Sequence, residues 1–508
     1  MPDPAQCAVP TDSTDAHRGD ALAASVVILL GINVVQRSIG FVRSVFFCRL
    51  LSPEELGKWD LVFNFVLLAA PFVSLAIPAA FGRYAEYFRG RGQLRTMVRR
   101  TAPACFLLTL VGSTAVYLFR PEFSLLIFGS RDQTGLVVLT AACLFVTILT
   151  HYVIELLNGL RRAKVLALVH LSNCVVFAAV GIGFLYAWER SADAVVIANT
   201  IACAVSLAGA LLYLRPAYLG LSIPSETPSQ AEFWKKIMPF VGWITLTNLM
   251  ANLFIVCDRY MIVHYADAGP NEALALVGQY HSSRVVPLLL ISICFLLGSV
   301  LLPHLSDDWE SGRRERVQER MNLFLKLCAI GLTGAGLAVL LFRPLIFDWA
   351  FKGKYSDGLA VLPLTLTYCV WFGLTAILQN YLFCVEKARL TSWAFATGLV
   401  LNVFLNYLLL PRFGLFGAVT ATTLANFVVL VLIAWFSHLL GLRFDPASLA
   451  VLAMPALLLL GIIPSLVGMT LLCLLSLRTH AIFSERQKML FLEKAREMTA
   501  KFRGRRGQ

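Results

Sequence analysis

The sequence predicts an all-α polytopic membrane protein with about 14 transmembrane helices. Of its 508 residues, 58% are hydrophobic and 14% are charged, and the mean hydropathy is +0.74. Soluble domains are about 45–50% apolar and about 25% charged, so no water-soluble core needs this much apolar surface. The apolar runs are long and the polar loops short, which indicates helices, because barrel strands alternate over about 10 residues.

A span of about 20 apolar residues defines each expected helix. The first six helices are expected near residues 22–51, 59–88, 102–119, 135–157, 165–188 and 194–214. The second six are expected near residues 237–264, 274–303, 321–342, 360–385, 391–410 and 414–440.

These spans divide the chain into domains. We expect an N-terminal six-helix bundle at 21–214, a cytoplasmic linker at 215–236 with Pro224 and Pro228, and a C-terminal six-helix bundle at 237–440. Residues 446–477 are almost uncharged but contain Pro455, Gly461 and Pro464. They form either one long helix or an additional membrane helix pair.

Basic loops fall on one side of this arrangement. They follow the second, fourth, eighth and tenth helices, at Arg83 to Arg100, Arg161 to Lys164, Arg313 to Arg320 and Glu386 to Arg389. Cytoplasmic loops retain Lys and Arg, so this side is expected to be the cytoplasm. The N-terminal tail, residues 1–20, is too polar for a signal peptide and is expected there as well. The basic amphipathic tail at 478–508 is also expected to be cytoplasmic, which requires an even number of helices and favours a C-terminal pair.

Short motifs recur between the two halves at a shift of 223 to 225 residues. The matched motifs are Phe119-Arg120-Pro121 with Phe342-Arg343-Pro344, Phe128-Gly129-Ser130 with Phe351-Lys352-Gly353, and Arg162-Ala163-Lys164 with Lys387-Ala388-Arg389. Six helices per half is an even number, so both halves are expected to insert in the same orientation. Two such pseudo-symmetric bundles around a central cleft are typical of a transporter.

Arginines interrupt the first apolar segment at Arg37, Arg43 and Arg49. A guanidinium at mid-membrane costs roughly 2.5–3.5 kcal/mol on insertion scales, so such residues usually face a wet cavity or a partner. Arg49 lies at the segment's end and can snorkel to the interface. For the deeper Arg37 and Arg43, we expect either binding of an anion such as a diphosphate or pairing with an acid. Arg284 has the same substrate-binding interpretation, with a hydrogen bond to a helix carbonyl as the alternative.

Four further charged residues lie in the apolar segments and are candidates for ion coupling or gating. Asp60 and Glu155 are expected either to couple transport to an ion or to pair with an arginine such as Arg37 or Arg43. Asp258 and Arg259 are adjacent, so a local ion pair is the alternative to a gate. Driving forces to consider are the membrane potential, Na⁺ and H⁺.

Several classes of site are not predicted. The twelve cysteines form no Cys-x-x-Cys, and no His-Glu-x-x-His or phosphate-binding loop is present, so neither a metal nor a nucleotide cofactor is expected. The outer loops are short and carry no paired carboxylates, so an enzyme such as a glycosyltransferase is not expected. The net charge of +13 comes from short scattered clusters, which argues against nucleic acid as a partner.

Ordered motifs over residues 21–440 resemble the multidrug/oligosaccharidyl-lipid/polysaccharide (MOP) exporter superfamily, and within it the polysaccharide flippases of the Wzx type. The motifs are Leu50 to Gly57, Arg83 to Tyr87, Cys257-Asp258-Arg259, Leu301 to Ser306, and the run from Leu401 through Asn406 to Gly414 with Gly417-Ala418. This resemblance implies alternating access to the two leaflets.

The segment Gln36 to Arg43 is also similar to the lipid II flippase branch of this superfamily. There the positions matching Arg37, Arg43, Asp60 and Arg284 line the central cavity, so the resemblance implies the same for this chain. A basic residue expected near the end of the second helix is absent, since Ala69-Ala70-Pro71 stands there. This departure favours a different lipid-linked glycan over lipid II.

The sequence therefore predicts an inner-membrane flippase or exporter for a polyprenyl-diphosphate-linked oligosaccharide in polysaccharide biosynthesis. Its expected partners are the lipid-linked oligosaccharide, the lipid bilayer and, by analogy with the family, polysaccharide polymerase and assembly proteins. The alternatives are a multidrug or organic-cation antiporter, whose cleft should be lined by acids, and a lipid II flippase.

Overall fold

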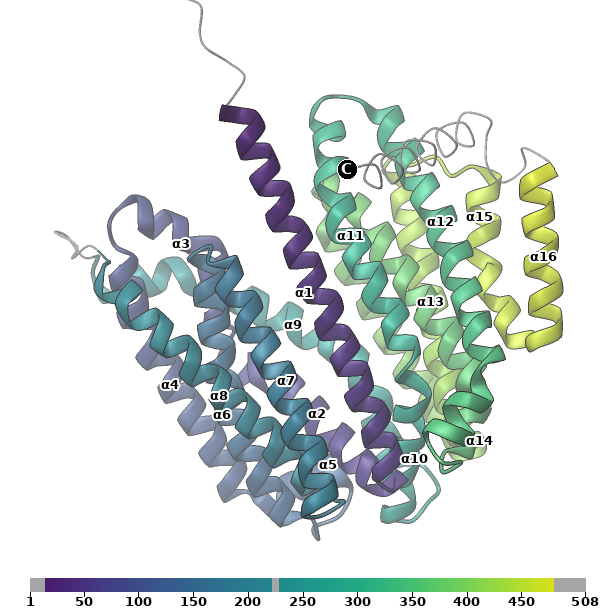
Figure 1. Ribbon diagram of the computed structural model, residues 1–508, viewed down its shortest axis with the longest axis horizontal. Coiled ribbons are helices and arrows are strands. Elements are labelled where there is room, and N and C mark those ends of the chain that lie inside the picture. Colours follow the sequence, from purple (N-terminus) through teal and green to yellow (C-terminus); the bar gives the residue numbers. More distant parts are fainter. Residues whose placement is uncertain (1–13, 222–227, 479–508) are drawn as a thin grey trace, which may run out of the picture.

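The computed structural model describes residues 14–221 and 228–478, and every regular element in these ranges is a helix, which confirms the all-α class. Ten helices of the described ranges are long and apolar enough to cross a membrane. The first helix, α1 (Thr14–Leu50), runs between two groups of helices (Figure 1). The C-terminal tail beyond Arg478 and the first 13 residues of the N-terminal tail lie outside the described residues.

The N-terminal group is built around α6, which packs against α4, α7 and α8. Its elements are α2 (Pro53–Val73), η1 (Ile77–Ala79), α3 (Ala80–Gly90), α4 (Leu94–Leu118), α5 (Arg120–Phe128), α6 (Thr134–Gly159), α7 (Ala163–Ala187) and α8 (Ala192–Leu219). Helix α1 joins this group through α7, where the Gln36 amide donates to the carbonyl of Ala167 at 3.3 Å.

The C-terminal group is built around α13, which packs against α10, α11, α12 and α14. Its elements are α10 (Pro270–Arg284), α11 (Pro287–Glu310), α12 (Arg314–Leu341), the π-helical η2 (Leu345–Ala350), α13 (Ser356–Cys384), α14 (Ala388–Leu439), α15 (Pro446–Ala453), η3 (Met454–Leu460) and α16 (Ile462–Arg478). The chain reverses between η3 and α16 at Gly461 (φ 90°), so residues 446–477 form two helical segments rather than one.

Helix α9 (Gln230–Tyr265) connects the two groups. Near its start, Arg100 of α4 donates to the carbonyl oxygens of Pro228 and Ser229 at 2.6 and 3.1 Å, which fixes this end to the N-terminal group. Its last turns pack against α10 and α14 of the C-terminal group. Because α8 extends to Leu219 and α9 begins at Gln230, helix occupies both ends of the segment expected to be a linker at 215–236.

Two helices expected to be continuous are broken, so these two predictions were wrong. The segment 59–88 ends as α2 at Val73 and resumes as α3 after Leu75 and Ala76, which adopt φ values of 49° and 46°. Pro71 and Pro78 flank this break and lack the N–H that a continuous helix needs. The segment 274–303 is divided into α10 and α11 directly before Pro287 for the same reason.

Helix α14 is a hairpin of two antiparallel helices that turn at Gly414. This glycine has φ 53° and ψ −135°, a conformation that residues with a Cβ rarely adopt. Across the hairpin, the Asn402 amide donates to the Thr422 hydroxyl at 3.1 Å, although the two residues are 20 positions apart. A Cβ at Gly417 would lie 2.4 Å from the carbonyl oxygen of Leu409, so only glycine permits this approach.

Turns at corresponding places in the two halves have the same backbone conformation. Arg161, between α6 and α7, and Glu386, between α13 and α14, have φ values of 58° and 59°. After each, the next N–H donates to the carbonyl five residues back, at 3.0 and 2.8 Å. Gly92 and Gly312 end α3 and α11 with φ values of 66° and 74°. This local similarity is what an internal repeat would produce.

Candidate functional site at the junction of α2, α9 and α10

The two groups meet where α2 packs on α10, and this is the most extensive contact between them. Glycines bring the two backbones together. A Cβ at Gly57 would lie 1.9 Å from the carbonyl oxygen of Leu274, and one at Gly278 would lie 1.8 Å from that of Pro53. A second contact lies near the ends of α5 and α9, where His264 Nε2 is 2.9 Å from the carbonyl oxygen of Leu126. The junction is therefore closed by backbone-to-backbone packing.

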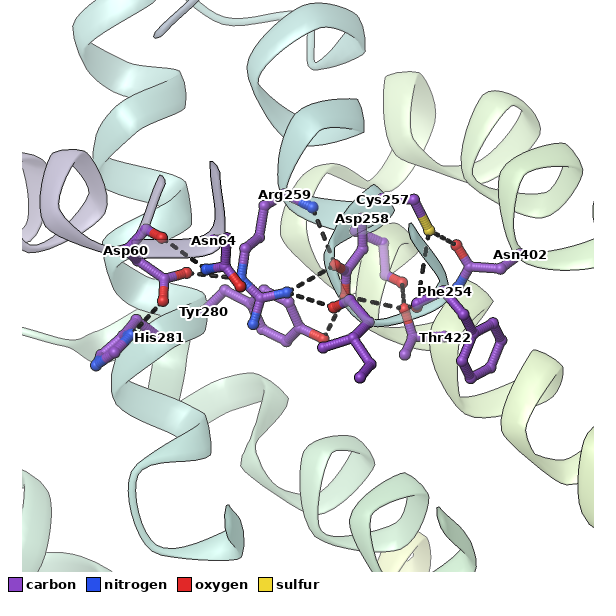
Figure 2. A network of polar contacts seen from close by, with 12 residues as sticks. Asp60, Asn64, Phe254, Cys257, Asp258, Arg259, Tyr280, His281, Asn402 and Thr422 are labelled. Carbon is purple, nitrogen blue, oxygen red and sulfur yellow. Dashed lines mark hydrogen bonds and ion pairs between the residues drawn. The ribbon is translucent and has the colours of Figure 1, made fainter. Parts of the chain in front are cut away.

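A buried ion network lies beside this contact (Figure 2). Arg259 of α9 donates from Nε to Asp60 of α2 at 2.6 Å and from Nη1 to Asp258 at 3.0 Å. The three side chains are 1 to 5% exposed. His281 Nδ1 of α10 is 2.7 Å from the other Asp60 oxygen. Asp60 thus joins the N-terminal group to α9 and α10.

The network continues into the C-terminal group. The Tyr280 hydroxyl donates to Asp258 at 2.6 Å and is 3.0 Å from the Tyr368 hydroxyl of α13. Thr422 of α14 donates to the same Asp258 oxygen at 3.4 Å and accepts from Asn402. The cluster of Asp60, Asp258, Arg259 and His281 therefore holds two carboxyl groups around one guanidinium, with an imidazole on the outer oxygen of Asp60.

A cavity of about 510 Å³ lies between the N-terminal group and α9, and the charged residues of the network do not line it. Its polar lining includes His151, His170, Glu155 and the four asparagines Asn173, Asn199, Asn248 and Asn252. The Asn173 and Asn199 amides donate to the sulfur atoms of Cys203 and Cys143 at 3.5 and 3.3 Å. Sulfur is a weak acceptor, so these amides keep most of their capacity for a ligand.

The three arginines predicted to bind substrate do not line this cavity. Arg37 is exposed on α1. The Arg43 guanidinium lies 4.1 Å from the Phe177 ring centroid, and that ring packs 5.6 Å from Trp59, which does line the cavity. Arg284 lies 5.4 Å from the Tyr280 ring. The Nε atoms of Arg43 and Arg284 are buried and have no hydrogen-bond partner among the described residues.

Of the four residues predicted for coupling or gating, the structure brings three together. Asp60, Asp258 and Arg259 share the network, whereas Glu155 faces the cavity from α6. The partners of Asp60 are Arg259 and His281 rather than Arg37 or Arg43. Sequence reasoning missed His281 and Tyr280. Their one signal is a helical spacing, which puts Val277, Tyr280, His281 and Arg284 on one face of α10.

The fold is shared with two groups of solved membrane transporters. The lipid II flippase MurJ in an inward closed conformation superimposes with a TM-score of 0.67 at 13% identity, covering 88% of this chain and 92% of that one. An inward-facing multidrug resistance transporter of the MATE family, in the MOP superfamily, gives 0.65 at 15% identity, covering 81% and 97%. The fold therefore defines the class, an all-helical membrane protein with the fold of these solved transporters, which is the fold that the sequence resemblance implied.

The family model for polysaccharide biosynthesis proteins matches residues 22–309, more than half of the chain, and the chain belongs to this family. The probable low-salt glycan biosynthesis flippase Agl15 of Haloferax volcanii is 21% identical over 447 residues, covering 87% of this chain and 89% of Agl15. The EPS I polysaccharide export inner membrane protein EpsE of Ralstonia solanacearum is 24% identical over 411 residues, covering 78% and 88%. An uncharacterized membrane protein of Methanocaldococcus jannaschii is 22% identical over 201 residues, 37% of this chain but only 39% of that protein.

Proposed function

We propose that this protein is a flippase that moves a polyprenyl-diphosphate-linked oligosaccharide from the cytoplasmic to the periplasmic leaflet of the bacterial inner membrane, in polysaccharide biosynthesis. The observation that carries the proposal is the amide-rich cavity in a chain of the polysaccharide biosynthesis family. Asn side chains both donate and accept hydrogen bonds, as the hydroxyl groups of a glycan require. An antiporter for organic cations needs acids instead, and Glu155 is the one acid among the described lining residues.

The diphosphate is proposed to bind Arg43 and Arg284. Arginine donates two hydrogen bonds at once to phosphate oxygens, and the Nε atoms of both residues lack a partner among the described residues. Arg43 contacts the ring of Phe177, which packs on Trp59 of the cavity lining, and this stack is proposed to rearrange so that the guanidinium reaches the substrate. Arg37 is proposed to attract the headgroup before it enters.

Alternating access is proposed to open the junction between α2 and α10. In the state described here, Gly57 and Gly278 hold the two helices in contact. Opening this side must separate Asp60 from Arg259 or His281, because these residues belong to different helices of the junction. We infer that Asp60, Asp258 and Arg259 form a gate, in which His281 of α10 is the second partner of Asp60.

The membrane potential offers a further driving force. A diphosphate diester carries about two negative charges, and an inside-negative potential favours their outward movement by about 2.3 kcal/mol per charge per 100 mV. Coupling to Na⁺ or H⁺ through Glu155 or the Asp258 network would add to this. Binding and translocation require no covalent chemistry from the protein, so we propose a transporter rather than an enzyme.

The proposed topology has fourteen helices in two pseudo-symmetric bundles plus a C-terminal pair, with both termini in the cytoplasm. Counting α14 as two helices and adding α1 and the two C-terminal apolar segments to the ten candidate spans gives this number. The matching turns at Arg161 and Glu386 support the pseudo-symmetry. The proposed partners are the lipid-linked oligosaccharide, the bilayer, and polysaccharide polymerase and assembly proteins.

The proposal is tested by mass spectrometry of lipid-linked sugars in a deletion strain, with leaflet location probed by a membrane-impermeant lectin. We expect a completed oligosaccharide lipid to accumulate and to stay inaccessible from outside until the wild-type gene is restored. Unchanged lipid-linked glycans together with new drug sensitivity would overturn the proposal and favour the antiporter. Accumulation of lipid II alone would favour the lipid II flippase.

A further inference from the structure

A second cavity, of about 590 Å³, forms a groove on the outside of the N-terminal group, between α4, α6 and α8. These helices lie on the side of that group away from the C-terminal group (Figure 1). Large apolar side chains beside the groove are exposed, with Leu107 60% and Leu212 73% exposed. In a membrane protein such a surface faces lipid. Glu155 faces the inner cavity from the opposite side of α6, so the groove is separate from the proposed substrate path.

The walls of the groove are apolar for most of its length. Ala102 and Phe106 of α4 form one wall and Leu207 and Leu211 of α8 form the other, each pair at the four-residue spacing of a single helix face. Helix α6 forms the floor with residues such as Val153. From Leu207 to Tyr218 the groove extends about 16 Å along α8. These dimensions fit an acyl chain.

One end of the groove is cationic. Arg99 of α4 and Arg215 of α8 line this end together with Tyr218, and no acid lines the groove among the described residues. Neither arginine makes an ion pair or hydrogen bond with any residue that the structure describes. Arg95 adds a third positive charge, with its guanidinium 5.4 Å from the Tyr218 ring.

Three neighbouring arginines, in contrast, have ion-pair or hydrogen-bond partners within the protein. Arg89 and Arg161 both pair with Glu86, at 2.5 and 2.8 Å, and Arg100 donates to the carbonyls that precede α9. In Arg99 and Arg215 the hydrogen-bonding capacity is unused by the described part of the chain, and the buried Nε of Arg95 beside them also has no partner there. Two unpaired guanidinium groups at the mouth of an apolar groove are complementary to a phosphate attached to an acyl chain.

The cationic end also lies at the depth of a lipid headgroup. Arg99 is five residues after the start of α4, and Arg215 is four residues before the end of α8, so both lie about 6–8 Å from the helix ends. The start of α4 lies in the basic loop Arg83 to Arg100 and the end of α8 lies in the linker at 215–236, both of which are expected in the cytoplasm. The cytoplasmic leaflet carries anionic phospholipids that attract Lys and Arg.

We propose that the groove binds one anionic glycerophospholipid of the cytoplasmic leaflet, with an acyl chain between α4, α6 and α8 and its phosphate on Arg99 and Arg215. A zwitterionic lipid carries a compensating positive charge and binds more weakly. The lipid supports the N-terminal group by filling the space that α6 leaves between α4 and α8. This inference does not depend on the transported substrate.

The test is native mass spectrometry of the full chain, purified in detergent and titrated with dioleoyl phosphatidylglycerol or dioleoyl phosphatidylcholine. Wild-type protein is expected to retain one phosphatidylglycerol in preference to phosphatidylcholine. Each arginine near an anionic headgroup adds to the binding free energy. We therefore expect Arg99→Gln together with Arg215→Gln to lower the affinity for phosphatidylglycerol about 30-fold. Glycerol phosphate, which lacks acyl chains, is not expected to compete.

Two further variants make the test specific. Arg316→Gln with Arg389→Gln removes the same charge from exposed positions at the starts of α12 and α14, away from the groove, and is expected to leave phosphatidylglycerol binding unchanged. Ala102→Trp fills the groove while keeping both arginines and is expected to abolish binding. The proposal is overturned if the two lipids bind equally, if Ala102→Trp still binds phosphatidylglycerol, or if the Arg99 and Arg215 variant matches wild type. If the variant with Arg99→Gln and Arg215→Gln loses glycan export but still binds phosphatidylglycerol, the groove is assigned to the transported lipid instead.

Discussion

Arg259 on α9 and Arg43 on α1 both interrupt apolar segments of the sequence, but they have opposite surroundings in the structure. Arg259 is 1% exposed, and two carboxylates accept hydrogen bonds from its guanidinium. Arg43, like Arg284, lies against an aromatic ring, and its buried Nε has no partner among the described residues. A buried arginine that is neutralised within the protein holds helices together. One that is not neutralised is available to an anionic ligand.

The largest effect is expected when Arg259, the cation paired with two carboxylates, is removed. We predict that Arg259→Met destabilises the protein severely, because it leaves Asp60 and Asp258 buried without their shared partner. Breaking a buried ion pair by removing one partner destabilises by about 3–5 kcal/mol. The expected result is loss of most folded protein, measured by fluorescence-detected size-exclusion chromatography with a thermal ramp.

The triple variant Asp60→Asn, Asp258→Asn, Arg259→Met is the matched control. It removes both carboxylates together with the guanidinium, so no uncompensated charge stays buried, and most of the thermal stability should return. If Arg259→Met alone is as stable as wild type, the network is not what holds α2, α9 and α10 together.

Removal of the unpaired cations Arg43 and Arg284 should reduce transport and leave stability unchanged. We predict that Arg43→Gln and Arg284→Gln each fold normally but reduce glycan export. A hydrogen bond to a charged group contributes about 1.5–3 kcal/mol, so each variant should lose roughly 10- to 100-fold in transport rate. Export is measured by complementation of a deletion strain, and stability by the same thermal ramp.

Arg49→Gln is the control for these variants. Arg49 also lies on α1, 5.7 Å from the ring of Trp349, but at the end of the apolar segment. Its loss should leave export within about twofold of wild type, because interfacial charges contribute little. Equal loss of export in all three variants would mean that the effect follows from removing any arginine of the apolar segments, and not from the unpaired Nε atoms of Arg43 and Arg284.

The helices could be predicted from the sequence, but the long-range partners of the buried charges could not. Apolar run length is a local property, so the helices and the all-α class were predictable. Asp258 and Arg259 are neighbours in the chain, and their ion pair was one of the two expected outcomes. The partnership of Asp60 with Arg259 joins residues 199 positions apart and depends on how α2 meets α9.

Two further features were missed for physical reasons. Hydropathy does not register the breaks after Val73 and before Pro287, because membrane helices tolerate prolines whose freed backbone groups find other partners. Only the left-handed conformations of Leu75 and Ala76 reveal the first break. His281 contacts Asp60 only because α10 packs on α2, and the two residues are far apart in the sequence. Its part in the network could therefore not be inferred from spacing alone.

The closed junction provides a third prediction, on conformation rather than stability. Gly278→Ala places a Cβ 1.8 Å from the carbonyl oxygen of Pro53, so α2 and α10 must separate. We predict a shift toward a state open at this junction. Spin labels at positions 132 and 267, in the loops after α5 and α9, should move apart in a background without native cysteines. Gly183→Ala, whose Cβ would meet nothing within 4 Å, should leave the distance unchanged.

The smallest effect is expected at Lys326, a third buried cation that is paired outside the junction. Its side chain is 2% exposed and contacts Asp445, which is 42% exposed and also caps α15. Burial raises the pKa of Asp445, but hydrogen bonds from Lys326 and Ser448 outweigh this and hold it below its usual value. A lowered carboxyl pKa contributes stability that is present above the unfolded value of about 3.9 and is lost as pH falls through the folded value. Asp445→Asn should destabilise by only about 1 kcal/mol, because the half-exposed position is open to water and the amide oxygen of Asn still accepts from the Lys326 ammonium, and the deficit should be constant from about pH 6 to 8. A deficit that grows across this range in thermal melts would show that a group other than Asp445 titrates beside Lys326.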